Sequence, residues 1–200
     1  MSVSDVKMVY AASMGRWEPD ARGRLAQAAL DLFDERGFDQ TTVADIAERA
    51  GLTERTFFRH FADKREVLFA GAGALEKLMI DAALEAPDSA TAIEAVSAAL
   101  VATCSVFDDR REFAGRRQAV IRANEELRER DLIKLASFAR AITAALRTRG
   151  VKEPTASLTA EAGVAAFRVA FERWTAPSNR YQLRRLIEDS LERLRNAFVA

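Results

Sequence analysis

The chain has 200 residues, 49% hydrophobic and 30% charged, which is the composition of an ordinary globular protein with one or two domains. Thirty basic residues balance 30 acidic ones, so net charge gives no general attraction to nucleic acid. The single cysteine, Cys104, excludes an intrachain disulfide and is expected to be a small buried hydrophobe. No segment reaches the roughly 18 apolar residues of a membrane span, and no signal-peptide core is evident. We therefore expect a cytoplasmic protein with no membrane partner.

The first segment, residues 1–19, lacks periodicity, and we expect a flexible N-terminal arm. A helix is then predicted from Ala21 to Arg36, because apolar residues recur there at helical spacing and Gly37 follows as a C-terminal stop. Arg22 and Arg24 in its first turn are candidates either for a phosphate contact or for plain solvent exposure.

Two short helices joined by a tight turn are predicted in the segment TVADIAERAGLTERTFFRHFADK, from Thr42 to Lys64. Thr42 and Asp45 form a capping box for the first helix. Gly51 ends it, because glycine adopts the positive φ of a tight turn, and the hydroxyl of Thr53 caps the second helix. This arrangement is typical of a helix-turn-helix.

The second helix is expected to present a DNA-binding face. Phe57 and Phe61 are four residues apart and face the core, and Arg55 and Arg59 lie opposite. Arginine can donate two parallel hydrogen bonds to guanine, and threonine or histidine can reach a base or a phosphate. The alternative is the solvated face of an ordinary amphipathic helix.

The run DARGRLAQAALDLFDERGFDQTTVADIAERAGLTERTFFRHFADKREVL, from Asp20 to Leu68, resembles the DNA-binding domain of the tetracycline-repressor (TetR) family of bacterial transcription regulators. The resemblance covers about a quarter of the chain. It implies that Lys64, at a helix N-terminus, contacts a phosphate. Phe58 departs from the tyrosine usual in the family, so a contact there must be apolar, for instance to a thymine methyl. The predicted DNA-binding residues are Thr42, Thr53, Arg55, Thr56, Phe58, Arg59, His60 and Lys64.

Acidic residues outnumber basic ones between Asp20 and Glu66. DNA binding must therefore depend on where individual charges point, and weak non-specific binding is expected.

Asp63 is predicted to cap a helix that runs from Lys64 to about Glu85, interrupted by Gly71 and Gly73. Beyond Pro87 the sequence predicts only helices, over residues 88–107, 110–121, 125–149, 160–174 and 181–198. The expected fold is all-α, with a three-helix helix-turn-helix domain over residues 20–66 and a helical effector-binding and dimerisation domain over residues 67–200.

The last two predicted helices carry broad stripes of large apolar side chains. A single bundle can bury these stripes, and the TetR resemblance implies instead an intersubunit four-helix bundle in a homodimer. The predicted interface residues are Val164, Phe171, Trp174, Leu183, Ile187, Leu191 and Leu194.

The same resemblance implies a pocket for a small-molecule effector, and the many phenylalanines favour an apolar or aromatic ligand. Periodicity does not distinguish such a pocket from a core. The candidate lining residues are Leu100, Cys104, Phe107, Phe113, Ile121, Phe138, Ile142 and Phe167, with Arg117, Arg122, Asn124 and Thr143 as polar anchors.

The sequence predicts no catalytic residue, metal site or cofactor, because it has one histidine and neither a phosphate-binding glycine loop nor a nucleophile paired with a base. The predicted function is a sequence-specific, double-stranded-DNA-binding regulator, a repressor that its effector releases from a palindromic operator. An enzyme and a helical protein-interaction module without DNA function remain the alternatives.

Overall fold

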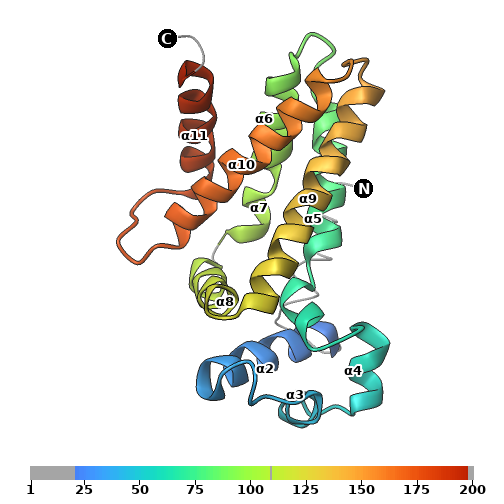
Figure 1. The fold of residues 1–200 in the computed structure, drawn as a ribbon, viewed down its shortest axis with the longest axis vertical. Coiled ribbons are helices and arrows are strands. Elements are labelled where there is room, and N and C mark those ends of the chain that lie inside the picture. The colour runs from blue at the N-terminus through green and yellow to red at the C-terminus, as the bar shows by residue number, and fades with distance from the viewer. Residues whose placement is uncertain (1–20, 109, 198–200) are drawn as a thin grey trace. The chain divides into compact units, whose positions relative to one another are not determined.

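The computed structural model describes residues 21–108 and 110–197, and all regular elements within these ranges are helical (Figure 1). The predicted all-α class is confirmed. The predicted N-terminal arm, residues 1–19, lies outside the described residues. None of the described helices is long and apolar enough to cross a membrane.

The chain divides into two compact units, and each is discontinuous in sequence. Of the described residues, the first unit contains residues 21–74 together with Glu112–Leu132. The second unit contains Leu75–Arg111 and the residues from Ile133 onward. This division differs from the expected one, which placed residues 112–132 in the C-terminal domain.

The first unit begins with three helices, α2 (Ala21–Arg36), α3 (Val43–Arg49) and α4 (Glu54–His60). The predicted bounds of α2 are confirmed, and Gly37 follows it with φ of 84°. The predicted capping box is present, since Thr42 accepts a hydrogen bond from the amide of Asp45 and the Asp45 carboxylate accepts one from the amide of Thr42. These local signals explain why the chain turns where it does.

The helix predicted from Lys64 to Glu85 is instead two elements, a 3₁₀ helix η1 (Arg65–Phe69) and α5 (Ala72–Glu85). Asp63 starts η1 as predicted, because its Oδ1 accepts hydrogen bonds from the amides of Arg65 at 2.8 Å and Glu66 at 3.1 Å. The break falls at Gly71, one of the two glycines expected to weaken this helix.

Residues 112–132 belong to the first unit because their apolar side chains complete its core. They supply most of α8 (Arg111–Ala123) and the start of α9 (Glu125–Thr148). Ile121 and Leu127 are fully buried in the same hydrophobic cluster as the helix-turn-helix. That cluster also contains Leu25, Leu30, Leu32, Phe33, Phe38, Ile46, Phe57, Phe61, Val67, Leu68 and Phe69.

The second unit contains most of α5 and α9 together with α6 (Ala92–Ala102), α7 (Cys104–Phe107), α10 (Thr155–Thr175) and α11 (Leu183–Ala197). The helix predicted over residues 88–107 is broken at Thr103, whose hydroxyl donates to the carbonyl of Leu100 at 2.6 Å. Helices α6, α10 and α11 pack on one another. Gly163 allows α10 to approach α6 closely, because a Cβ at this position would collide with Val96.

Candidate nucleic-acid interface

The outer face of α4 carries three exposed side chains that can reach a ligand, those of Arg55, Phe58 and Arg59. Their spacing of three and four residues places them on one side of the helix. Phe58 is 55% exposed, and its ring lies 5.5 Å from that of Phe57. Thr56 and His60 flank this face and are half-buried.

The inner face of α4 fixes the helix against the core. Phe57 has no exposed surface, and its ring lies 5.4 Å from that of Phe61. The guanidinium of Arg22 lies over the ring of Phe61, 5.1 Å from its centre. The hydroxyl of Thr53 accepts a hydrogen bond from the amide of Thr56 at 3.2 Å, which confirms the predicted cap. The exposed arginines therefore project from a helix that is anchored at its start and along its inner side.

Arg24 supports the turn between α3 and α4, a role that the sequence did not indicate. Its guanidinium donates to the carbonyl of Ala50, the residue that ends α3. Gly51 follows with φ of 65°, and a Cβ there would lie 2.9 Å from Nη2 of Arg24. The glycine thus provides both the left-handed conformation and the space that this contact needs. Sequence spacing alone does not reveal a contact between residues so far apart in the chain.

The ammonium group of Lys64, predicted to contact a phosphate, is held within the protein. It donates hydrogen bonds to the carbonyls of Phe38 at 2.7 Å and Thr41 at 2.9 Å. It also lies 4.1 Å from the centre of the Phe38 ring. Partial burial lowers the pKa of Lys64. Lys64 therefore fastens the link between α2 and α3, whatever contact it makes with DNA.

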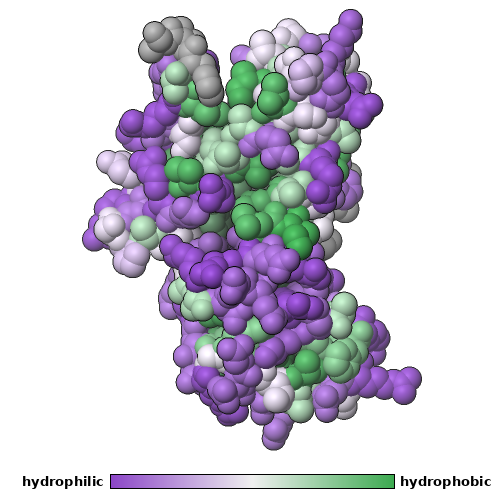
Figure 2. Space-filling model, viewed as in Figure 1, coloured by the Kyte–Doolittle hydropathy of each residue, from purple (hydrophilic) through white to green (hydrophobic). Residues whose placement is uncertain are grey.

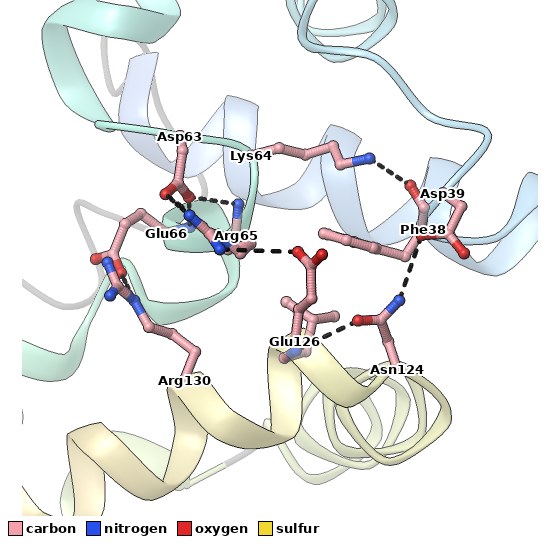
Figure 3. A network of polar contacts seen from close by, with 10 residues as sticks. Phe38, Asp39, Asp63, Lys64, Arg65, Glu66, Asn124, Glu126 and Arg130 are labelled. Carbon is pink, nitrogen blue, oxygen red and sulfur yellow. Dashed lines mark hydrogen bonds and ion pairs between the residues drawn. The ribbon is translucent and has the colours of Figure 1, made fainter.

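A polar network connects η1 with the start of α9 (Figure 3). Arg130 donates to the carboxylate of Glu66, and Arg65 lies between Asp63 at 2.8 Å and Glu126 at 3.7 Å. The hydrogen bond from Arg65 holds the pKa of Asp63 below its ordinary value. These contacts attach residues 112–132 to the element that follows the recognition helix.

Several acidic residues of the helix-turn-helix domain form ion pairs with arginines outside α4. Arg116 contacts Asp31 at 2.7 Å and Asp34 at 2.5 Å. Arg49 donates to both oxygens of Glu35 at 2.8 and 2.9 Å, which lowers the pKa of that carboxyl group. These ion pairs involve neither Arg55 nor Arg59.

The predicted effector-pocket residues do not form one group. Phe113 and Ile121 pack in the core of the first unit. The remaining six, Leu100, Cys104, Phe107, Phe138, Ile142 and Phe167, lie in the second unit. Burial raises the pKa of the Cys104 thiol to about 11, as expected for a packed, unreactive cysteine.

The suggested polar anchors of the pocket have other partners. Arg117 donates to the carbonyl of Leu68 at 2.6 Å, and Asn124 accepts from the amide of Leu127 at 3.3 Å. Thr143 donates to the carbonyl of Ala139, one turn earlier in α9, at 2.8 Å.

Most of the predicted dimer-interface residues are buried within the single chain. Val164, Trp174, Leu183, Ile187 and Leu191 are buried, and Phe171 and Leu194 are half-buried. Within one chain these stripes lie where α6, α10 and α11 pack on one another. The assignment of these residues to an intersubunit surface stays a prediction.

Aromatic rings connect two sets of residues that the sequence assigned to different sites. Phe107, a predicted pocket residue, lies 5.1 Å from Phe171 and 5.8 Å from Trp174, both predicted interface residues. Phe167 lies 5.7 Å from Phe171. Together these four side chains form part of the core of the second unit.

Comparison with known proteins gives matches concentrated in the helix-turn-helix. Residues 25–70 match the family model described as bacterial regulatory proteins, tetR family. The chain is 38% identical over 78 residues to the transcriptional regulator TcmR of Streptomyces glaucescens, covering 39% of this chain and 34% of TcmR. It is 45% identical over 47 residues to the transcriptional repressor KstR2 of Mycobacterium tuberculosis, covering 24% of each chain.

These alignments span about a third and about a quarter of the two relatives. The similarity in fold covers more of the chain than these alignments do, as the crystal structure of FadR from Bacillus subtilis in complex with stearoyl-CoA shows. Its TM-score is 0.56 at 21% identity, covering 86% of this chain and 96% of FadR.

Proposed function

We propose that the chain is a TetR-family regulator, as the match of residues 25–70 indicates, and that it is a homodimeric repressor that a small effector releases from a palindromic operator. The observation that carries this proposal is the exposed face of α4, with Arg55, Phe58 and Arg59 on a capped and anchored helix. An α-helix of this kind fits the major groove of B-DNA.

The side chains of α4 are suited to different parts of the DNA. Arg55 and Arg59 are proposed to read guanine edges by paired hydrogen bonds, and Phe58 to contact a thymine methyl. Thr56 and His60 flank them and are proposed to contact bases or phosphates. Thr42 and Thr53 cap the helices α3 and α4, so they bring helix N-termini as well as hydroxyls to the phosphates.

A second stripe on α10 is the surface that we propose for the dimer. It consists of Leu158, Ala162, Ala165 and Val169, at steps of four, three and four residues. Leu158 is 66% and Val169 45% exposed. Figure 2 shows apolar surface among the polar atoms over α6, α10 and α11. Because the two central residues are alanines, a second α10 can approach closely.

A dimer is required because one recognition helix reads only a few base pairs. Two helices related by a dyad read half-sites about 34–36 Å apart from centre to centre. Val169→Asp is therefore expected to give monomers in light scattering and to lose operator binding. Ala119→Asp, at an exposed alanine of α8, is the matched control. A dimer that survives Val169→Asp would place the interface elsewhere.

The experiment that tests the function is selection of bound duplexes from a random DNA pool near physiological salt, where non-specific contacts are weak. Enrichment of a palindrome with half-sites one helical turn or more apart is expected. If a folded dimer enriches no sequence, even at lower salt, the proposed function is wrong.

The selected operator then separates base contacts from phosphate contacts. Arg55→Ala or Arg59→Ala is expected to lose about 1–3 kcal/mol at the correct site and to relax base preference. Lys64→Ala is expected to weaken all sequences alike and to reduce the salt slope by about one unit. Arg49→Ala is the control, because this exposed arginine pairs with Glu35. Equal behaviour of the α4 variants and Lys64→Ala would contradict these roles.

The effector is proposed to be a small, largely apolar molecule bound by the second unit. The neighbouring FadR structure contains stearoyl-CoA, a ligand with a long apolar chain. Effector binding is proposed to favour a state in which the two recognition helices no longer match successive major grooves. This coupling is reciprocal, so operator DNA must weaken effector binding by the same factor, and equal effector affinity with and without DNA would refute it.

A further inference from the structure

A groove runs between α5 and α9 on the second unit. Its volume is about 390 Å³, within the range of small-molecule sites, and it contains none of the pocket residues predicted from the sequence. All its lining residues belong to the second unit, so its shape does not depend on the placement of the first. We call it the α5–α9 groove.

The floor of the α5–α9 groove is apolar. Ile80 and Leu84 come from α5, and Ala141, Ala144 and Ala145 come from α9. Leu84 is 41% exposed, so a large hydrophobic surface meets water here. The lining continues along α9 from Ser137 to Thr148, which is roughly 16 Å at 1.5 Å per residue. This floor has the length and chemistry to take an extended apolar chain or a pair of fused rings.

Three of the four polar side chains in the groove already have partners. The hydroxyl of Ser137 donates to the carboxylate of Glu76. The hydroxyl of Thr148 donates to the carbonyl of Ala144 at 3.1 Å. Arg140 differs, because this exposed guanidinium makes no hydrogen bond or ion pair with another of the described residues. The groove thus combines an apolar floor with one guanidinium that has no partner among the described residues and one carboxylate, that of Glu76, that is bound by Ser137.

We propose that the α5–α9 groove binds a small amphiphile with one anionic group, with the anion on Arg140 and the apolar part on the floor. Arginine recognises a carboxylate or a phosphate by two parallel hydrogen bonds. Arg140 lies near the Ser137 end of the lining stretch of α9, so the apolar part extends from it toward Leu84 and Thr148.

A second arginine follows α9 close in sequence to the Thr148 end of the groove. Arg149 donates to the carbonyls of Ala86 and Pro87, each at 2.6 Å, and so fixes the end of α5 to the end of α9. Its guanidinium is occupied there. Arg140 is therefore the guanidinium that the groove offers to a ligand.

Only the role of the ligand as an effector rests on the proposed function. Binding of the ligand to the groove needs no DNA and can be measured separately. The first measurement is accordingly a calorimetric titration of the full chain, without DNA, with decanoate and with decylamine. These probes share an apolar chain and differ in the sign of the head group. Decanoate is expected to bind, and decylamine at least roughly tenfold more weakly.

Two variants test the placement of the ligand. Arg140→Gln is expected to weaken decanoate roughly tenfold or more, by loss of the charged pair. Ala144→Leu fills the floor at an exposed helical position and is expected to abolish binding with little effect on the fold. Arg195→Gln removes an exposed arginine of α11 outside the groove and is the control. Thermal unfolding confirms that each variant is folded.

The proposal is overturned if decanoate does not bind, if decylamine binds equally well, or if Arg140→Gln matches the control. Binding that survives Ala144→Leu also overturns it, because the ligand then occupies another site. The DNA selection described above tests the proposed function separately, because its outcome does not depend on these titrations. A chain that binds decanoate in the groove but enriches no operator would retain the site and lose the proposed function.

Discussion

Leu127 offers a sharp test of the discontinuous first unit. This residue lies near the start of α9, remote in sequence from the helix-turn-helix, yet it is completely buried in the core that holds α2 and α4. Leu127→Ala is therefore expected to destabilise α2, α3 and α4. A division at residue 66, as the sequence suggested, predicts that the same change affects only the C-terminal domain.

The magnitude follows from the burial of the side chain. Removal of a fully buried leucine side chain costs about 2–5 kcal/mol, because lost transfer free energy adds to the cavity that remains. Leu132 is the matched control on the same helix, since it is 60% exposed. Leu132→Ala is expected to change stability by less than about 1 kcal/mol.

Hydrogen–deuterium exchange measured by mass spectrometry shows where the effect falls. Each 1.4 kcal/mol corresponds to a factor of ten in an equilibrium constant. A fall of about 3 kcal/mol in the free energy of unfolding therefore accelerates the amide exchange that proceeds through unfolding by roughly 100-fold. This acceleration is expected in peptides from α2, α3 and α4 in Leu127→Ala and not in Leu132→Ala. Unchanged exchange in these helices, with faster exchange confined to the second unit, would refute the assignment.

Three further outcomes follow from individual groups. Lys64→Met removes the hydrogen bonds to the carbonyls of Phe38 and Thr41. Urea denaturation without DNA is expected to show that the free energy of unfolding falls by about 1–3 kcal/mol. Unchanged stability would mean that these bonds contribute nothing to it. Arg65 lowers the pKa of Asp63 from 3.8 in the folded state, so the contribution of Asp63 to the free energy of unfolding is present above about pH 3.8 and is lost as the pH falls below it. Asp63→Asn is therefore expected to flatten the acid limb of a plot of stability against pH. Burial raises the thiol pKa of Cys104 from 9.0 to about 11, so its contribution to the free energy of unfolding is full below pH 9.0 and falls as the pH rises toward 11. The native protein is expected to resist alkylation by iodoacetamide at neutral pH. Rapid labelling would contradict the burial of this thiol.

Local signals in the sequence predicted much of the DNA-binding face. The capping box of Thr42, the positive φ of Gly51 and the cap of Thr53 each depend on neighbours within a few residues. Helical periodicity then placed Phe57 inside and Arg55 outside. These features follow from backbone geometry and side-chain hydrogen bonds that do not require the rest of the fold.

Contacts between distant segments decided the rest. Arg24 and Lys64 were read as surface cations, but each hydrogen-bonds carbonyl groups far along the chain. The stripe that includes Ile187 was expected at a subunit interface and is buried inside the second unit. An apolar stripe predicts that a helix face is covered, but it does not tell whether another helix of the same chain or a second subunit covers it.

The sequence by itself therefore determined the all-α class, the helix-turn-helix and the exposed face of α4. Only the tertiary structure decided that residues 112–132 complete the first core, which faces of α10 remain exposed, and that Arg140 stands beside an apolar groove. The physical reason is the range of the interactions. Caps, turns and periodicity act over a few residues, whereas a core or a groove is formed by side chains brought together from separate segments.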